Sequence, residues 1–220
     1  MAVQLAPSML AADFLNLSAG VEIVNKYADI FHLDVMDGIL VPNLSFGFPV
    51  VDAIAKKAEK PLDVHLMIVK PWNYFERFAK SGADMISFHL EAARLDGKDP
   101  NALLRDIKAL GVKAGLAINP DIPVEDLYPY LAEADFILIM SVFAGFGGQK
   151  FIPESLERIA TLKAELDRRG LDKVRIEVDG GVGAGNAGAL VKAGAEILVA
   201  GSSVFRAENP AEACAAIKCN

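Results

Sequence analysis

The sequence predicts an α/β fold, a single (β/α)8 TIM barrel that occupies residues 1–220 as one domain. Three observations predict this fold. Short apolar runs of strand-forming residues recur along the chain, helix-forming segments lie between them, and no linker or low-complexity tract divides the 220 residues. This alternation is typical of a parallel sheet covered by helices, and one barrel fits a chain of this length.

Eight runs are predicted to be strands because each is short, nearly all apolar and bounded by turn or helix signals. They are residues 3–8, 29–35, 62–68, 84–90, 112–118, 135–142, 174–180 and 196–202. Helices are predicted over 48–58, 71–80, 99–110 and 154–168, with Pro71, Pro123 and Pro153 at helix starts. Glycines in 81–84, 110–112 and 193–196 fit positions where a helix ends before a strand.

The composition argues against several classes of partner. The formal net charge is −7 and the pI is near 5.0, without a long run of Lys or Arg, so we expect no binding to nucleic acid or to membranes. The first residues lack a cationic segment ahead of an apolar stretch, so we expect a cytoplasmic protein. Cys214 and Cys219 lie close together near the end of the sequence and are expected to have no catalytic role.

Polar and thioether side chains gather at the ends of seven of the eight predicted strands, where the active sites of such barrels are built. Side chains alternate along a strand, so residues two apart, such as His32 and Asp34, point to the same side, into the barrel. The candidates are Ser8, His32, Asp34, Met36, Asp37, His65, Met67, His89, Glu91, Met140, Glu177, Asp179, Gly201 and Ser202.

Four of these candidates predict a metal site. His32, Asp34, His65 and Asp179 would offer two imidazoles and two carboxylates to one divalent ion per subunit: zinc, iron(II), cobalt or manganese. Each residue alone could equally be a core histidine or an ion-pair partner. Four together at the strand ends of one barrel favour a metal. His89 could be a supporting or packing residue instead of a ligand.

Glycine-rich segments after the last three strands predict a phosphate site, because glycines let backbone N–H groups approach phosphate oxygens. They contribute Gly145, Phe146, Gly147, Gly148, Gly180, Gly181, Gly201 and Ser202, and 202–208 could form the short extra helix of such sites. Neither a P-loop nor a dinucleotide fingerprint is present. Met36, Met67 and Met140 could fill the core or cover a planar intermediate.

The segments APSMLAADF, HLDVMDGILVPN, LDVHLMI, FHLEA, GFGGQKFIP, EVDGGV and VAGSSVF together resemble the ribulose-phosphate 3-epimerase family, from residue 6 to residue 205. The resemblance implies an isomerase of the pentose phosphate pathway that interconverts D-ribulose 5-phosphate and D-xylulose 5-phosphate. It implies that His32, Asp34, His65 and Asp179 hold the metal, which stabilises an enediolate, and that Asp34 and Asp179 exchange protons with C3 of the sugar. Ser8 and His65 would contact the sugar phosphate, and homo-oligomers are expected.

Two segments depart from the family pattern. Phe143 and Ala144 stand where the family usually has Asn-Pro, and Ile39 and Leu40 replace a His or Arg followed by Phe. An alternative is therefore the six-carbon substrate of a D-allulose-6-phosphate 3-epimerase. A lyase on the same barrel is disfavoured because DVMDGI at 34–39 lacks the lysine of the lyase motif DxKxxD. A barrel that binds sugar phosphates without chemistry would require a broken carboxylate or metal set.

Overall fold

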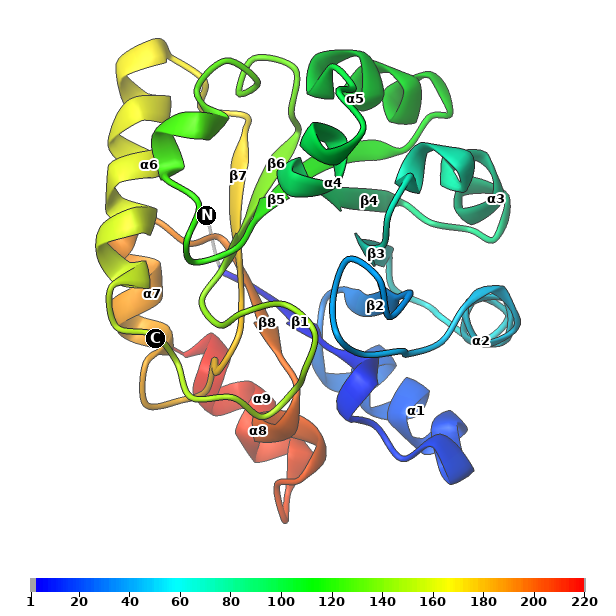
Figure 1. The fold of residues 1–220 in the computed structure, drawn as a ribbon. Helices are drawn as coiled ribbons and strands as arrows, with labels where there is room; N and C mark the ends of the chain where they lie inside the picture. Colours follow the sequence, from blue (N-terminus) through cyan, green and yellow to red (C-terminus); the bar gives the residue numbers. More distant parts are fainter. Residues whose placement is uncertain (1–2, 220) are drawn as a thin grey trace.

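The computed structural model describes residues 3–219, and within them eight parallel strands form one sheet (Figure 1). The strands are β1 (Gln4–Pro7), β2 (Phe31–Met36), β3 (Leu62–Met67), β4 (Met85–His89), β5 (Lys113–Ile118), β6 (Phe136–Met140), β7 (Arg175–Asp179) and β8 (Ile197–Ala200). Their order is β1-β8-β7-β6-β5-β4-β3-β2, and a parallel bridge between Ser8 and His32 brings the two edges together. The prediction of a (β/α)8 TIM barrel is confirmed.

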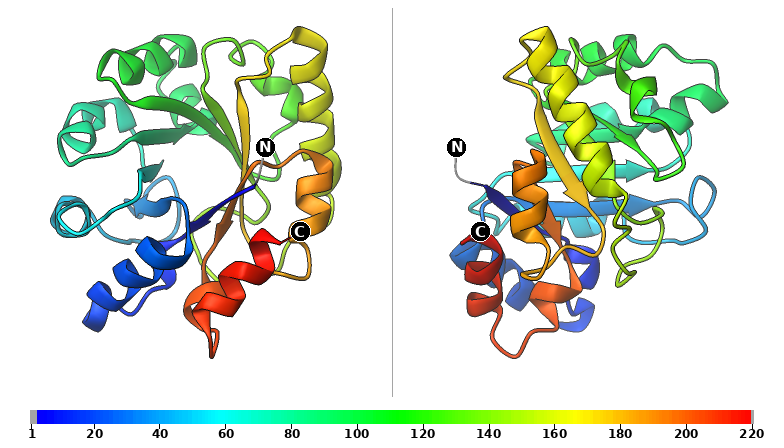
Figure 2. Two further views of the ribbon diagram at one scale, coloured as in Figure 1. Left: turned by 180° about the vertical axis from the view of Figure 1, so that it is seen from behind. Right: turned by 90° about the vertical axis from the view of Figure 1, so that its left-hand side faces the viewer.

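The helices lie outside the ring of strands (Figures 1 and 2). They are α1 (Leu17–Tyr27), α2 (Phe48–Ala55), α3 (Phe75–Lys80), α4 (Leu90–Leu95), α5 (Pro100–Ala109), α6 (Ser155–Arg169), α7 (Ala187–Ala193), α8 (Ser202–Phe205) and α9 (Pro210–Lys218). Short 3-10 turns are η1 (Met9–Ala11), η2 (Phe14–Asn16), η3 (Pro71–Asn73) and η4 (Val124–Leu127). Within residues 3–219, none of the helices combines the length and the apolarity that crossing a membrane requires.

The helix-stop glycines have the predicted conformation. Gly82, Gly111 and Gly194 have φ angles of 99°, 78° and 119°, a region that side chains with a Cβ rarely adopt. The segment after Pro123 differs from the prediction, since it forms only the turn η4. Pro129 explains this, because a proline in a helix interior removes a hydrogen bond and clashes with the carbonyl four residues earlier.

The predicted helix over 71–80 is divided into η3 and α3. Tyr74, between them, has a φ of −123° and a ψ of −9°, outside the α-helical region, and Lys70 before η3 is left-handed. Pro71 therefore begins a 3-10 turn, and the α-helix starts at Phe75.

Apolar side chains fill both the space between strands and helices and the interior of the barrel. At the amino-terminal end of the strands, the fully buried ring of Phe136 occupies the barrel beside Gly115. A Cβ on Gly115 would lie 2.2 Å from Cζ of Phe136, so only glycine leaves room for this ring. The opposite end of the barrel is left for polar side chains.

The loops at the carboxyl ends of the strands extend at one end of the barrel. The right view of Figure 2 shows the loops after β2 and after β6 protruding together. Asn43 Nδ2 donates to the carbonyl oxygen of Gly145 at 2.7 Å, which connects these two loops across 102 residues of sequence. Because all strands are parallel, the residues at their carboxyl ends meet beneath these loops.

Candidate active site

A cavity of about 280 Å³ opens at the carboxyl ends of the strands. Of the predicted site residues, those that line it are Ser8, Asp34, Met36, Met67, Met140, Gly145, Phe146, Gly147, Gly148, Asp179, Gly180, Gly181, Gly201 and Ser202. His32 and His65 lie beneath this lining and are completely buried. The cavity therefore has carboxylates and thioethers on its floor and glycine-rich loops at its side.

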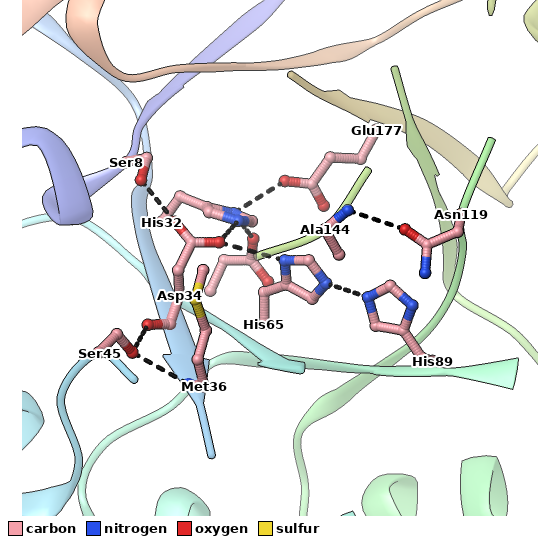
Figure 3. Close-up of polar contacts among 11 residues, drawn as sticks. Ser8, His32, Asp34, Met36, Ser45, His65, His89, Asn119, Ala144 and Glu177 are labelled. Carbon is pink, nitrogen blue, oxygen red and sulfur yellow. Dashed lines mark hydrogen bonds and ion pairs between the residues drawn. The ribbon is translucent and has the colours of Figure 1, made fainter. Parts of the chain in front are cut away.

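The four predicted metal ligands come together. One ligand atom from each of His32, Asp34, His65 and Asp179 can be chosen so that all four lie within 4.8 Å of one another. Asp34 is the centre of the group, since its Oδ1 lies 3.3 Å from both His32 Nε2 and His65 Nδ1. Strands β2, β3 and β7 supply these residues, and Figure 3 shows both imidazoles directed at Asp34.

The orientation of His32 fits a cation. Its Nδ1 lies 2.6 Å from Asp63 Oδ2, whereas its buried Nε2 faces Asp34 Oδ1 at 3.3 Å without a well-formed hydrogen bond to any residue within 3–219. A carboxylate that accepts from one ring nitrogen leaves the other free to bind a metal. Burial opposes a positive charge on His32, but the carboxylates of Asp34 and Asp63 outweigh it and raise the pKa of His32 well above its usual value.

The two aspartates at the cavity have pKa values shifted in opposite directions. Burial would raise the pKa of Asp34, but the charges and hydrogen bonds of His32 and His65 outweigh it and hold this pKa well below its usual range. Burial, and then the negative charge of Asp34, raise the pKa of Asp179 to about 7. One carboxylate is therefore ionised while its neighbour can hold a proton near neutral pH, as acid–base pairs require.

A second acidic layer lies below the four predicted metal ligands. Glu177 and Asp63 are fully buried, and Glu177 Oε1 lies 3.3 Å from His32 Nδ1. Burial, followed by the charge of Asp63, raises the pKa of Glu177 to about 8, so Glu177 is mostly protonated at neutral pH. His32 thus has two carboxyl neighbours, Asp63 and Glu177, on the side away from the cavity.

The predicted substrate-contact residues on β2, β3 and β6 pack around the cluster. Met36, Met67 and Met140 are buried in one apolar group and line the cavity. The Ser8 hydroxyl donates to Asp34 Oδ2 at 2.5 Å and also lines the cavity. Apolar thioether side chains and a hydroxyl group therefore lie beside the two aspartates.

The glycine turns after β6 and β7 need glycine at defined positions. Gly181 has a φ of 64°, and a Cβ there would lie 2.5 Å from the backbone nitrogen of Phe151. Gly180 has a φ of 122° and is equally close to Val142. These contacts bring the backbone of the loops after β6 and β7 together at the side of the cavity.

Several residues of the site were missed by sequence reasoning. Asn119 follows β5, the strand end without a candidate, and its Oδ1 accepts from the Ala144 backbone N–H at 2.9 Å. Its polarity after an apolar strand was the available signal. Among the described residues lining the cavity, Arg206 alone carries a positive charge, and it follows α8. Ser45 bonds the Asp34 carbonyl and the Met36 N–H, and Asn43 bonds Gly145, so loop residues also shape the site.

The model of the ribulose-phosphate 3 epimerase family matches residues 4–205. The chain belongs to this family. It is 48% identical over 219 residues to the ribulose-phosphate 3-epimerase of Synechocystis sp., covering 98% of this chain and 93% of that one. It is 41% identical over 222 residues to the cytoplasmic isoform of Oryza sativa subsp. japonica, covering 99% and 93%. The prediction of an epimerase of this family is confirmed.

The crystal structure of 3-hexulose-6-phosphate synthase from Salmonella typhimurium is also similar to this epimerase. Its TM-score is 0.71 at 17% sequence identity, and the match covers 98% of this chain and 97% of that one. At this identity the likeness concerns the barrel fold alone.

Proposed function

We propose that this epimerase interconverts D-ribulose 5-phosphate and D-xylulose 5-phosphate by moving protons at C3. The observation that carries the proposal is the pair Asp34 and Asp179, which face one cavity with pKa values shifted in opposite directions. The names of the curated relatives support the same substrate pair.

His32, Asp34, His65 and Asp179 would hold one divalent cation, with zinc, iron(II), cobalt and manganese as the candidates. The unbonded, buried Nε2 of His32 supports this assignment. The cation supplies positive charge against the negative charge that develops on the sugar oxygens next to C3.

Inverting C3 requires removing a proton from one face and adding one to the other. The ionised Asp34 takes the C3 proton as general base, and Asp179, which regains a proton from solvent after the cation has bound, gives that proton to the opposite face of the enediolate. In the reverse direction the two carboxyl groups exchange roles. Ser8 keeps one oxygen of Asp34 oriented through its hydrogen bond, and Met36, Met67 and Met140 exclude water from the intermediate.

The phosphate of the substrate is assigned to the glycine-rich side of the cavity. Backbone N–H groups around Gly180, Gly181, Gly201 and Ser202, together with those of 145–148, would surround its oxygens. Arg206 adds a positive charge near α8.

The test incubates the protein with D-ribulose 5-phosphate in deuterated water and follows C3 and the product by NMR. We expect xylulose 5-phosphate with deuterium at C3, and loss of this reaction after chelation. Asp34→Asn and Asp179→Asn should each reduce epimerisation at least about 100-fold with the fold retained, because each removes one proton carrier. Turnover like that of the parent protein in either variant would refute the acid–base assignment.

A six-carbon substrate, D-allulose 6-phosphate, is the second candidate because Phe143 and Ala144 line the cavity in the loop after β6. Phe143 is 52% exposed, so its ring can move to admit a longer sugar. The ratio of kcat/KM for the pentulose and hexulose phosphates, measured on the same preparation, decides between the two substrates.

We further propose that the protein acts as a homo-oligomer in the cytoplasm. Apolar side chains are exposed near the carboxyl ends of β1 and β2, with Leu15 fully exposed, Ile39 at 73% and Leu44 at 71%. Surfaces of this kind favour contacts between subunits. Light scattering on the purified protein tests this proposal, and a monomer at micromolar concentration would refute it.

A further inference from the structure

A line of hydrogen bonds leaves the metal cluster through His65. The Nε2 atom of His65 lies 2.9 Å from Nε2 of His89, and the two rings stack with an interplanar angle of 16° (Figure 3). Both imidazoles are completely buried. A hydrogen bond between two ring nitrogens requires one of them to carry a proton and the other to be bare.

The line continues from His89 to Glu91. His89 Nδ1 lies 3.4 Å from Glu91 Oε1, and the same oxygen accepts from the backbone N–H and the side-chain amide of Asn119, at 3.1 and 2.8 Å. Burial would raise the pKa of Glu91, but the hydrogen bonds from His89 and from the backbone outweigh it and lower it to about 2. Glu91 is therefore a carboxylate, which can only accept hydrogen bonds.

The line has a carboxylate at each end, Asp34 and Glu91, so a cation on His65 Nδ1 and the acceptor Glu91 together set its direction. With Nδ1 of His65 bound to a cation, His65 carries its proton on Nε2 and donates to the bare Nε2 of His89, whose Nδ1–H faces Glu91. In the reverse arrangement His65 Nδ1–H donates to Asp34 Oδ1, 3.3 Å away, and Glu91 acts against this arrangement. The proton position on each ring is set by the bond that its other nitrogen makes.

We propose that Glu91 and His89 are positioning residues that hold His65 in the tautomer able to bind a metal, and that Glu91 also anchors the glycine loop through Asn119. This proposal rests on the metal site proposed above. Asn119 connects Glu91 to the loop, because its Oδ1 accepts from the Ala144 N–H at the start of the loop. One partly buried carboxylate thus connects a proposed metal ligand with the loop over the cavity.

Without Glu91 the direction of hydrogen-bond donation between His89 and His65 can reverse. His89 could then carry its proton on Nε2 and donate it to His65, whose own proton would move to Nδ1, between the ring and Asp34. A proton there competes with a cation for the same lone pair. Loss of a hydrogen-bond partner behind a metal-binding histidine typically lowers metal affinity about 10- to 100-fold.

The composition of the chain allows a direct test, because its three histidines are His32, His65 and His89. Long-range ¹H–¹⁵N NMR spectra of ¹⁵N-histidine-labelled protein report the protonation of each ring nitrogen, with assignment by single His→Gln variants. In zinc-loaded protein we expect the metal on Nδ1 of His65, with the His65 proton on Nε2 and the His89 proton on Nδ1. Zinc bound to Nε2 of His65, or a His89 whose Nδ1 carries no proton, would overturn the proposal.

Variants at position 91 test the function of the line. Glu91→Leu should move the His65 proton to Nδ1 and weaken zinc binding about 10- to 100-fold, measured by competition with a chromogenic chelator. Glu91→Gln keeps an acceptor oxygen and should recover most of the affinity. Glu125→Gln, which changes an exposed glutamate of η4, is the control. Circular dichroism confirms the fold of each variant. Equal zinc affinity in Glu91→Leu and the control would reject the proposal.

Asn119→Ala separates the two parts of the proposal, the tautomer of His65 and the anchoring of the glycine loop. It removes the acceptor for the Ala144 N–H but keeps Glu91 opposite His89, so the histidine spectra and zinc affinity should stay within about twofold while KM for ribulose 5-phosphate rises. An unchanged KM would remove Asn119 from the proposal. Failure of the metal site is recognised separately, as zinc that shifts none of the three histidines in the parent protein.

Discussion

Loading the metal-free protein with zinc should release protons, and their number can be worked out from the four ligands. His32, whose pKa is raised well above its usual value, carries a proton at neutral pH that must leave before Nε2 can bind. Asp179 has its pKa raised to about 7 by burial and by Asp34. Asp34 is already ionised, and burial first of all lowers the pKa of His65 to about 4.

Two groups, His32 and Asp179, therefore contribute protons to the release. With a pKa of about 7, Asp179 holds about 0.9 proton at pH 6, about 0.5 at pH 7 and about 0.1 at pH 8, and His32 adds the proton that its raised pKa retains. The contribution of Asp179 to the release should therefore fall by about 0.8 proton per zinc between pH 6 and pH 8. The sign follows from the raised pKa of Asp179, since its proton is bound below this pKa and already absent above it. Asp34 and Asp63 raise this pKa, and His32 lowers it.

Isothermal titration calorimetry in pairs of buffers with different ionisation heats measures the release at each pH. Asp179→Asn removes this group, so the release of protons by the variant should lose the decrease that Asp179 causes between pH 6 and pH 8. Release that increases with pH in the parent protein, or that keeps its pH dependence in Asp179→Asn, would refute the assignment of Asp179 as a protonated ligand.

Three further predictions concern binding, packing and the intermediate. Arg206→Gln should raise KM for the sugar phosphate up to about fivefold at low salt with kcat unchanged, because an exposed ion pair contributes only modestly to binding. Equal KM values in the variant and the parent protein would remove Arg206 from the phosphate site. Gly115→Ala should lower the free energy of unfolding by about 1–3 kcal/mol in urea melts, because its Cβ overlaps Phe136, whereas Gly47→Ala, with open space at its Cβ, should not. Met67→Leu should lower kcat if the thioether covers the intermediate, and unchanged turnover would leave Met67 as core filling.

The grouping of His32, Asp34, His65 and Asp179 could be predicted because it depends on rules that act locally. Alternation along β2 places His32 and Asp34 on one side, and the same rule applies to His65 in β3 and Asp179 in β7. Closing parallel strands into a barrel brings their carboxyl ends together, so the four residues meet without any knowledge of side-chain torsions.

The remainder of the site depends on contacts that no local pattern encodes. His65 and His89 are 24 residues apart, and Asn119 reaches Ala144 across 25. Whether these side chains bond depends on their rotamers and on the strand register, in which β5 places Asn119 just beyond its last pair. Asn119 also precedes a proline, which in sequence resembles an ordinary turn. Arg206 lies beyond the predicted glycine segment and carried no separate signal.

A synthase with the same barrel shows that the fold alone does not decide the chemistry, so the decision lies with the strand ends. In this chain, Asp37 at the end of β2 accepts hydrogen bonds from the backbone N–H groups of Ile39, Leu40 and Val69, so it holds the loop and not a reacting group. Among the described residues that line the cavity, none is a lysine. We therefore propose that proton transfer in the cavity depends on Asp34 and Asp179, because their pKa values are shifted in opposite directions, which suits inversion at one carbon.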